Sequence, residues 1–397
     1  MHPTILKPSP TPLPLVVLLG VLIALPALGT DLFVPALPAL TQALGTEVGA
    51  GQLMMTLYFI GLAAGQLAWG PLSDRYGRKP ILLAGLGIML AASLAAMLME
   101  TLAAVIAARL AQGLGMASGA LIGRTIARDL YAHEQAAKLL SSMSVVFSIV
   151  PLAAPLAGGL LADAAGWPSV FAAMAAIAVA LLVAVVPLRE TAPARRAPAS
   201  PRQIMRTFAG ILGDRRFLGP YSVFLCTQIG VLAWVSNSSF TLISGLGVGP
   251  TAYGAMFTLV MSGQIIGAWM SSRLVLRLGI PRMLRWGAAL MLAGGACAAG
   301  LAWLGVGHWL AVVAPFVLSR AMRKVEGWQD LARPTRNFGI VLIAALAVTG
   351  ATTGTAVQGW TQRGAIVLVA LGVSSLAWRV LRLESRPVRT AGLLAGR

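Results

Sequence analysis

An acid and a base stand inside long apolar stretches of this sequence, Asp31 in the first stretch and Arg109 in the fourth. Counted as helix, Asp31 lies about 25 Å from the start of its stretch, which is within the depth of a lipid layer. A charge at that depth costs about 2.5–3.5 kcal/mol or more, so it should face a cavity or an opposite charge. Burial favours a neutral carboxyl group, which can release its proton when a cavity opens to water or a cation arrives. Asp31 is therefore predicted to take up and release a proton, and Arg109 to face a cavity or an opposite charge.

Both residues also have a simpler interpretation. Arg109 could lie two turns from the end of its stretch and extend its side chain to the water interface. Asp31 could be a hydrogen-bonded carboxylate at the outer interface, beside helix breaks at Pro35 and Pro38. Polar and aromatic residues of other apolar stretches either line a path for a solute or join helices by hydrogen bonds worth about 0.6 kcal/mol. These candidates for a substrate cavity are Tyr58, Gln66, Gln228, Trp234, Asn237 and Gln264.

The elements that must position these residues are membrane-spanning helices. Hydrophobic residues make up 58% of the 397 residues and charged residues only 11%, against about 25% charged in soluble domains. A stretch of about 20 apolar residues crosses a bilayer as a helix, whereas the alternation typical of a barrel strand is missing. The sequence predicts an all-α membrane protein with about 12 transmembrane helices, the tenth doubtful: 14–40, 51–71, 80–99, 101–123, 139–162, 167–188, 217–244, 252–276, 282–305, 307–318, 338–359 and 364–381.

The formal net charge of +18 would also suit a nucleic-acid-binding protein, but its placement argues against that class. Lys and Arg gather in the tails and in every second loop, whereas the opposite loops hold only Arg363. This one-sided bias predicts that both termini are cytoplasmic. The positive positions are Lys7; Arg75, Arg78 and Lys79; Arg124, Arg128 and Lys138; and those within 189–216, 273–285, 320–336 and 379–397.

The longest polar interruption, residues 189–216, is rich in Ala, Pro and Arg and divides the chain near its middle. It predicts a cytoplasmic linker between an N-terminal six-helix bundle over 1–188 and a C-terminal bundle over 217–397. Its second part, 203–212, could lie on the membrane surface as a short amphipathic helix. Paired halves are typical of rocking transporters, whose substrate site lies near the midplane of the membrane.

A charged turn, Gly70–Pro80 (GPLSDRYGRKP), joins the second and third segments. Gly70 is expected to let two helices approach closely, and Gly77 to adopt a positive φ in the turn. Arg78 and Lys79 are expected to hold the turn at the cytosolic face. The alternative is a merely basic turn between two helices.

The fifth segment carries two prolines and two glycines within Ser148–Leu160 (SIVPLAAPLAGGL). Each proline removes a helix hydrogen-bond donor, and the glycines allow a partner helix to pack closely. A packing role alone would also explain them. The four residues are Pro151, Pro155, Gly158 and Gly159.

Three of these patterns resemble motifs of the major facilitator superfamily: the Gly70–Pro80 turn, Ile106–Gly115 around Arg109, and Ser148–Leu160. Within the superfamily the chain is most similar to the Bcr/CflA drug-resistance branch. The similarity covers roughly residues 13–318 and is most specific in the first 165. It is carried by Thr30–Leu40, Leu57–Pro80, Arg124–Tyr131 and Trp234–Ile243.

The resemblance implies the major facilitator fold, two pseudo-symmetric six-helix bundles in a bacterial inner membrane. It implies proton-coupled antiport of small lipophilic drugs such as phenicols, bicyclomycin-like compounds or sulfonamides, by a protein that is expected to be a monomer. It ties Arg109 to proton coupling, and it marks Pro151–Gly159 as a motif of exporters more than importers. It also implies a conformational latch in the turn, where Asp74 engages the opposite half; the turn's residues are Gly70, Asp74, Arg75, Gly77, Arg78 and Lys79.

The resemblance stops after Leu318, where Ser319–Asp330 (SRAMRKVEGWQD) interrupts the tenth segment. The dozen or so apolar residues before this charged run would span only about 18 Å as helix. Residues 338–381 are still apolar enough for two spans, so the topology can survive. A change of reading frame would leave a tail of this kind, which makes a damaged transporter one alternative.

We therefore expect efflux by alternating access, in which Asp31 takes up an external proton and Arg109 balances its charge. Two alternatives remain open: proton-coupled uptake on the same fold, and a non-transporting remnant with a frame-altered C-terminus. An enzyme is not expected, because His133-Glu134 is followed by Ala137 where a zinc protease needs a second His. No cofactor, metal or disulfide is expected either, since Cys226 and Cys297 both fall in apolar stretches.

Overall fold

The computed structural model describes residues 12–131, 133–192, 206, 210–211, 231–232, 234–263, 265–267, 270 and 273–274. The chain divides into two compact units: Met1–Ile204 with Val235–Thr258, and Met205–Trp234 with Leu259–Arg397. Nearly all described residues belong to the first unit. The segments predicted from 282 onward, Gln228 and Gln264 lie outside the described residues.

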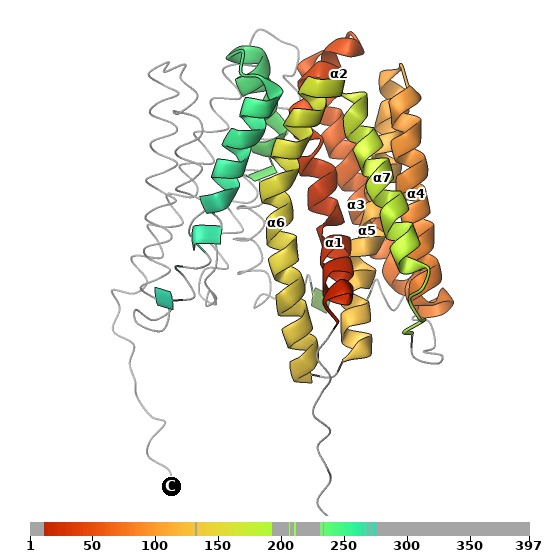
Figure 1. The fold of residues 1–397 in the computed structure, drawn as a ribbon. Coiled ribbons are helices and arrows are strands. Elements are labelled where there is room, and N and C mark those ends of the chain that lie inside the picture. The colour runs from red at the N-terminus through yellow and green to blue at the C-terminus, as the bar shows by residue number, and fades with distance from the viewer. Residues whose placement is uncertain are drawn as a thin grey trace, which may run out of the picture. The chain divides into compact units, whose positions relative to one another are not determined.

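The first unit is a bundle of long helices, with no strand among the residues that the structure describes (Figure 1). The elements are α1 (Leu13–Asp31), η1 (Val34–Ala36), α2 (Leu37–Ala43), α3 (Val48–Tyr76), α4 (Arg78–Leu98), α5 (Leu102–Leu130), α6 (His133–Ala165), α7 (Pro168–Val185) and the π-helical turn η2 (Phe240–Gly245).

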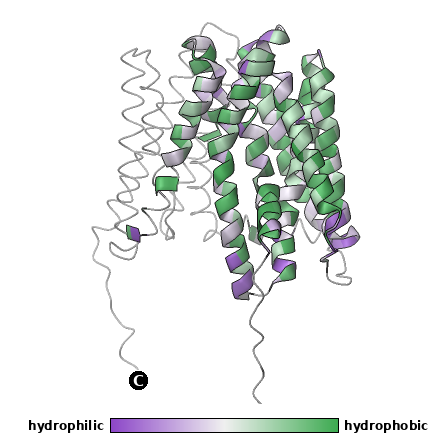
Figure 2. Ribbon diagram, viewed as in Figure 1, coloured by the Kyte–Doolittle hydropathy of each residue, from purple (hydrophilic) through white to green (hydrophobic). Residues whose placement is uncertain are grey.

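Six spans in this part of the chain are long and apolar enough to cross a membrane, which confirms the first six predicted segments. Figure 2 shows apolar residues along the helices and hydrophilic residues gathered at their ends, for example at the lower end of α6. Several helices run past the predicted boundaries, as α3 does from the predicted end at 71 to Tyr76. A hydropathy boundary stops at the first charges, whereas a helix continues into the polar interface.

The first predicted span, 14–40, is not one continuous helix. α1 ends at Asp31, and the short 3-10 turn at Val34–Ala36 separates it from α2. Pro35 lies in this turn and Pro38 opens α2, where the missing N–H of each proline is no loss. Asp31 is therefore the last residue of α1.

α5 is the central helix of the bundle and packs against α1, α3 and α4. Two glycines make the closest of these contacts possible. A Cβ at Gly61 would overlap the carbonyl oxygen of Leu110, and a Cβ at Gly113 would overlap that of Tyr58. Among the residues that the structure describes, Gly70 has an ordinary contact with Leu121 at 3.8 Å. Whether Gly70 brings two helices together stays a prediction.

α6 remains helical through Pro151 and Pro155, packs against α1, and meets the helical residues 250–258 (Figure 1). A Cβ at Gly158 would overlap the carbonyl oxygen of Leu32, and a Cβ at Gly159 would overlap that of Pro250. The close packing expected of these two glycines is thus present. The division into bundles at 188 and 217 stays a prediction, and residues Val235–Thr258 group with the first unit.

Candidate functional site

The centre of the bundle holds one fully buried cation, Arg109 on α5, whose side chain has 0% exposure. Its Nη1 donates to Oε1 of Gln112 at 2.5 Å, and its Nη2 donates to the carbonyl oxygen of Gly29 at 3.1 Å. The guanidinium carbon lies 4.0 Å from the ring centroid of Phe33 and 4.3 Å from that of Tyr58. Its Nε has no hydrogen-bond partner among the residues that the structure describes. The cation does not reach the water interface, so the interfacial interpretation of Arg109 is wrong.

Tyr58 and Gly29 bring α3 and α5 against α1 around this cation. The hydroxyl of Tyr58 donates to the carbonyl oxygen of Pro26 at 2.9 Å and contacts the sulfur of Met116 at 3.3 Å. A Cβ at residue 29 would lie 2.5 Å from the Tyr58 hydroxyl and would overlap the Met116 sulfur. Gly29 therefore leaves the space in which its own carbonyl meets the Arg109 guanidinium.

Gln112 extends the polar cluster to two more helices. Its Nε2 donates to the hydroxyl of Ser93 on α4 at 2.7 Å and contacts the sulfur of Met174 on α7 at 3.1 Å. Ser93 donates in turn to the carbonyl oxygen of Met89 at 2.7 Å. Because buried polar groups lose their bonds to water, each of these contacts offsets a desolvation cost. A chain of contacts thus joins Arg109 to helices on the far side of α5.

Asp31 lies at the end of α1, beside this cluster, and is buried with 7% exposure. Asp31 lies within electrostatic reach of two buried tyrosines, Tyr58 of α3 and Tyr253 of the segment 250–258. Leu32, the next residue, packs its backbone against Gly158 of α6. Asp31 is therefore buried within the bundle, as a proton-binding acid would be, and it also lies next to the helix break at Pro35. Each of the two interpretations of Asp31 thus describes one part of its surroundings.

Tyr253 and Ser238 form a buried hydroxyl pair that sequence reasoning missed. Their oxygens lie 2.7 Å apart, and Ser238 also contacts the carbonyl oxygen of Val235 at 3.3 Å. Gly254 packs against the carbonyl of Pro155, and Leu32 at the end of α1 packs against Gly158. The segment 250–258 and the end of α1 therefore both contact the Pro151–Gly159 motif of α6. A single Tyr in an apolar run carries no signal by itself.

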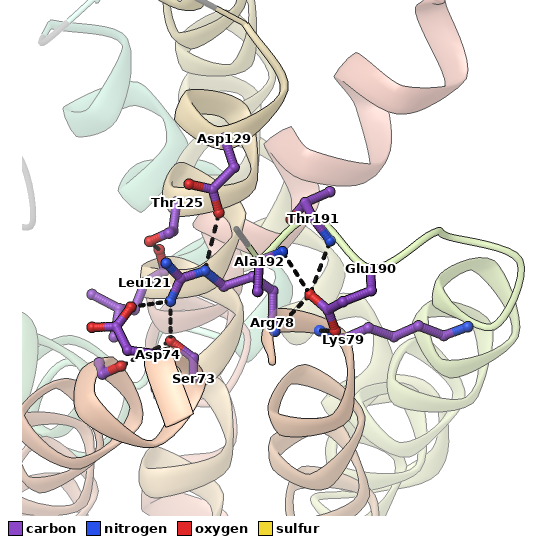
Figure 3. A network of polar contacts seen from close by, with 11 residues as sticks. Ser73, Asp74, Arg78, Lys79, Leu121, Thr125, Asp129, Glu190, Thr191 and Ala192 are labelled. Carbon is purple, nitrogen blue, oxygen red and sulfur yellow. Dashed lines mark hydrogen bonds and ion pairs between the residues drawn. The ribbon is translucent and has the colours of Figure 1, made fainter. Parts of the chain in front are cut away.

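A second buried arginine, Arg78, organises the end of the bundle where α3 meets α4 (Figure 3). Its Nη1 donates to Asp74 Oδ1 at 2.6 Å and to the Ser73 hydroxyl at 2.7 Å, and its Nε donates to Asp129 Oδ2 at 3.0 Å. The two acids lie at the C-terminal ends of α3 and α5, and the cation begins α4. Each charge stands at the end of its helix where the helix dipole disfavours it. The three residues therefore stabilise one another only as a cluster.

The turn between α3 and α4 is a single residue, Gly77, with a φ of 99° as the sequence predicts. A Cβ at this position would lie 2.6 Å from the Oε2 of Glu190. The Glu190 carboxylate accepts the backbone N–H groups of Arg78 at 2.9 Å and of Lys79 at 3.1 Å (Figure 3). The backbone N–H groups of Thr191 and Ala192 donate to the same carboxylate, each at 2.9 Å.

These donors alter the acidity of Glu190. Partial burial by itself would raise the pKa of this carboxyl group, but the four backbone N–H groups together hold its pKa below the ordinary value of 4.5. Hydrogen bonds to the charged form of an acid favour that form. Glu190 is thus an ionised acceptor at the N-terminus of α4, where a negative charge is favourable.

The remaining predicted residues lie in different surroundings. Arg75 stands over the Tyr76 ring at 5.1 Å, and Nζ of Lys79 donates to the carbonyl oxygen of Val186 at 2.5 Å. Gln66 is exposed on α3. Asn237 is exposed and accepts a hydrogen bond from Gln52 Nε2 at 2.6 Å, and Trp234 is buried within the second unit. Whether these residues line a substrate cavity stays a prediction.

Three acids with clear structural roles were not selected from the sequence: Asp129, Glu190 and Asp163. The Asp163 carboxylate accepts the backbone N–H of Thr251 at 2.9 Å and also its hydroxyl. The chain has only 12 acidic residues, so an acid at the end of a predicted helix could have been recognised as a candidate for a structural contact. In the part of the chain that the structure describes, no group of three His, Cys, Asp or Glu residues could hold a metal.

A bundle of apolar spanning helices around buried charges defines a multi-pass membrane protein. Residues 19–323 match the Major Facilitator Superfamily, and the chain belongs to that family of transporters. The family and the fold class predicted from the sequence are both confirmed.

The names of three relatives refer to drug resistance or multidrug transport. The chain is 30% identical over 294 residues to the bicyclomycin resistance protein homolog of Haemophilus influenzae, covering 73% of this chain and 74% of that protein. It is 31% identical over 276 residues to the multidrug transporter MdfA of Yersinia pestis, covering 69% of this chain and 67% of that protein. It is 28% identical over 283 residues to a chloramphenicol resistance protein of Pseudomonas aeruginosa, covering 70% of this chain and 66% of that protein.

Solved structures share the fold. The nucleoside transporter NupG matches with a TM-score of 0.67 at 13% identity, covering 93% of this chain and 99% of that one. A D-xylose–proton symporter matches with a TM-score of 0.59 at 16% identity, covering 92% of this chain and 88% of that one. At these identities the likeness concerns the fold and not the substrate.

Proposed function

We propose that this chain is a proton-coupled exporter of small lipophilic compounds that works by alternating access. The observation that carries the proposal is Arg109, a fully buried cation whose Nε lacks a hydrogen-bond partner in the described part of the chain. An ionisable group inside a membrane protein is costly and is kept for function, most often for the passage of ions or protons. The buried acid Asp31 on the neighbouring helix α1 is the group to which we assign the transported proton.

The proposed coupling follows from the charges around Asp31. An ionised Asp31 stands at the C-terminal end of α1, where the helix dipole is negative and repels a carboxylate. The positive charge of Arg109, held at the carbonyl of Gly29 two residues earlier, offsets this repulsion. Uptake of a proton by Asp31 removes its negative charge and leaves the positive charge of Arg109 without a counter-charge. The packing of helices around α1 then depends on whether Asp31 is protonated. Export results if the carrier binds the substrate and the proton in turn.

The orientation and the latch are part of the same proposal. We assign the end of the bundle with Arg78, Arg124 and Lys138 to the cytoplasm of a bacterial cell, because Lys and Arg gather there. The Asp74–Arg78–Asp129 cluster at that end is the proposed latch that engages the other half of the protein. We further propose a monomer with both termini in the cytoplasm.

The substrate class is inferred from the relatives, whose names include bicyclomycin resistance, multidrug transport and chloramphenicol resistance. The six polar and aromatic candidates remain the proposed contacts of the substrate. Pro151, Pro155, Gly158 and Gly159 support the export direction only through the family resemblance.

The proposal is tested by Asp31→Asn in cells and in inverted membrane vesicles, with Glu100→Gln as the matched control because Glu100 is exposed on the α4–α5 turn. We expect Asp31→Asn to abolish pH-driven chloramphenicol export while the amount of protein in the membrane is unchanged. Export equal to wild type in this variant would refute the role of Asp31. The direction of flux in the same vesicles separates export from uptake.

One observation favours a second candidate, a non-transporting remnant. The family match ends at residue 323, close to the point where the sequence pattern changes after Leu318. Residues 319–397 lie outside the described residues. Expression in a drug-sensitive strain against a panel of phenicols, sulfonamides and bicyclomycin distinguishes the candidates, since a remnant raises resistance to none of them.

A further inference from the structure

Helix α4 has no capping side chain of its own, because its N-cap residue is Gly77. The first backbone N–H groups of a helix have no partner within it. In α4 the third helical residue is Pro80, which has no N–H, so Arg78 and Lys79 are the donors that need an acceptor. Both donate to the carboxylate of Glu190, which is 112 residues from Arg78 in the sequence. The first residues of the linker thus supply the cap of this helix.

The same carboxylate is fixed from its own side of the contact. The N–H groups of Thr191 and Ala192 donate to Oε1 of Glu190, so the chain folds around the carboxylate just after α7. A second bond between the segments joins Nζ of Lys79 to the carbonyl oxygen of Val186. The exit of α7 and the entry of α4 are therefore joined in two ways: the Glu190 carboxylate binds the backbone at the start of α4, and the Lys79 side chain binds the backbone at the end of α7.

We propose that Glu190 is a positioning residue for Arg78, and that it makes the start of the linker a working part of the proposed latch. Arg78 is held at both ends: its backbone N–H by Glu190, and its guanidinium by Asp74 and Asp129. A displacement of the linker start acts on the backbone of Arg78 and, through it, on the two acids. The capping of α4 by Glu190 is inferred from the hydrogen bonds alone, whereas the effect of this cap on transport rests on the proposed function.

Hydrogen exchange tests the cap without any substrate. In Glu190→Ala, we expect the amides of Arg78 and Lys79 to exchange about two- to thirtyfold faster, which corresponds to the loss of a helix cap. Glu100→Ala, at the opposite end of α4, is the control and should leave these amides unchanged. Unchanged exchange at Arg78 and Lys79 in Glu190→Ala would overturn the proposal.

Two further variants test whether the charge of Glu190 and its close approach to Gly77 are both needed. Glu190→Gln keeps one acceptor oxygen but places an amide donor against the other N–H, so it should restore only part of the protection. Gly77→Ala gives an independent check because its new Cβ would lie 2.6 Å from the Glu190 Oε2. The added exchange caused by Gly77→Ala should be smaller in a Glu190→Ala background, where that clash is gone; strictly additive effects would contradict the contact.

Chloramphenicol export completes the test. Faster exchange at Arg78 together with about threefold to tenfold slower export in Glu190→Ala supports the proposal. Faster exchange with export equal to wild type overturns the link to the latch. If wild type exports none of the probes while the exchange result holds, the proposed function fails and the positioning of Arg78 by Glu190 stands.

Discussion

Within the described residues, the bundle contains two buried arginines whose surroundings differ in kind. Arg78 contacts two carboxylates and a hydroxyl, and its backbone N–H binds a third carboxylate. Arg109 binds a carbonyl and an amide oxygen, lies against two aromatic rings, and leaves its Nε unpaired. One cation is neutralised at the edge of the bundle, and the other is solvated by dipoles and rings at its centre.

This difference separates a fixed contact from a responsive one. Charge-assisted bonds to carboxylates are short and strong, so the Arg78 cluster holds three helices together at one end. A cation that keeps an unpaired donor in a site of low dielectric responds strongly to any charge that forms nearby. In the proposed function, Arg109 is the residue that registers whether Asp31 carries a proton, and Arg78 is the residue that holds one arrangement of helices.

The largest effect is expected at Arg109. Arg109→Ala removes two buried bonds to a charged group, each worth about 1.5–3 kcal/mol, so chloramphenicol export should fall at least about a hundredfold. Arg109→Lys keeps the charge but not the planar fork, and it should still lose about tenfold. Wild-type export by both variants, at equal protein levels, would show that the central cation has no part in transport.

Arg78 should give the next largest effect. Arg78→Ala leaves Asp74 and Asp129 facing each other without their cation, and thermal unfolding in detergent should show a loss of about 1–3 kcal/mol. Arg75→Ala is the neighbour for comparison and should cost less, since Arg75 only stands over the Tyr76 ring. If the two alanine variants unfold alike, the cluster around Arg78 is not what holds this end together.

A smaller loss is expected for Tyr58→Phe. The ring that faces Arg109 remains, and the contacts of the hydroxyl with the carbonyl oxygen of Pro26 and the sulfur of Met116 are removed. The free energy of unfolding should fall by about 0.5–1.5 kcal/mol, measured by thermal unfolding of the purified protein. A loss as large as that of Arg78→Ala would mean that the hydroxyl does more than join α1 to α3.

The smallest effect concerns the pH dependence of Glu190. Its pKa in the folded protein lies below the ordinary 4.5, so its contribution to stability is present above about pH 4.5 and is lost as the pH falls through the lowered pKa. The groups that donate to it are the backbone N–H groups of Arg78, Lys79, Thr191 and Ala192, which do not titrate in this range. The difference in unfolding temperature between wild type and Glu190→Gln should therefore be constant near neutral pH and shrink in acid. A difference that persists unchanged in acid would show that ionised Glu190 is not its source.

Much of this arrangement could be predicted from sequence because it depends on local rules. Apolar length predicts the first six spans, and the Gly at position 77 predicts the positive φ of the turn. Burial of Arg109 followed from the cost of leaving a cation among lipid tails. These features each depend on a few neighbouring residues.

What could not be predicted are contacts between distant segments. Glu190 and Arg78 are 112 residues apart, and nothing in either stretch names the other as its partner. The close helix contacts of Gly61 and Gly113 were not predicted, since composition alone does not say which face of a helix is turned inward. The Tyr253–Ser238 pair was missed for the same reason, because two hydroxyl residues become a pair only once the chain has folded.

The central claim is that Asp31 exchanges its proton for substrate next to Arg109. It is tested most directly by adding chloramphenicol to purified protein in weakly buffered detergent solution and following the pH with an indicator dye. Wild type should release protons on binding, and Asp31→Asn should release none while still binding the drug. Proton release by Asp31→Asn equal to that of wild type would contradict the account.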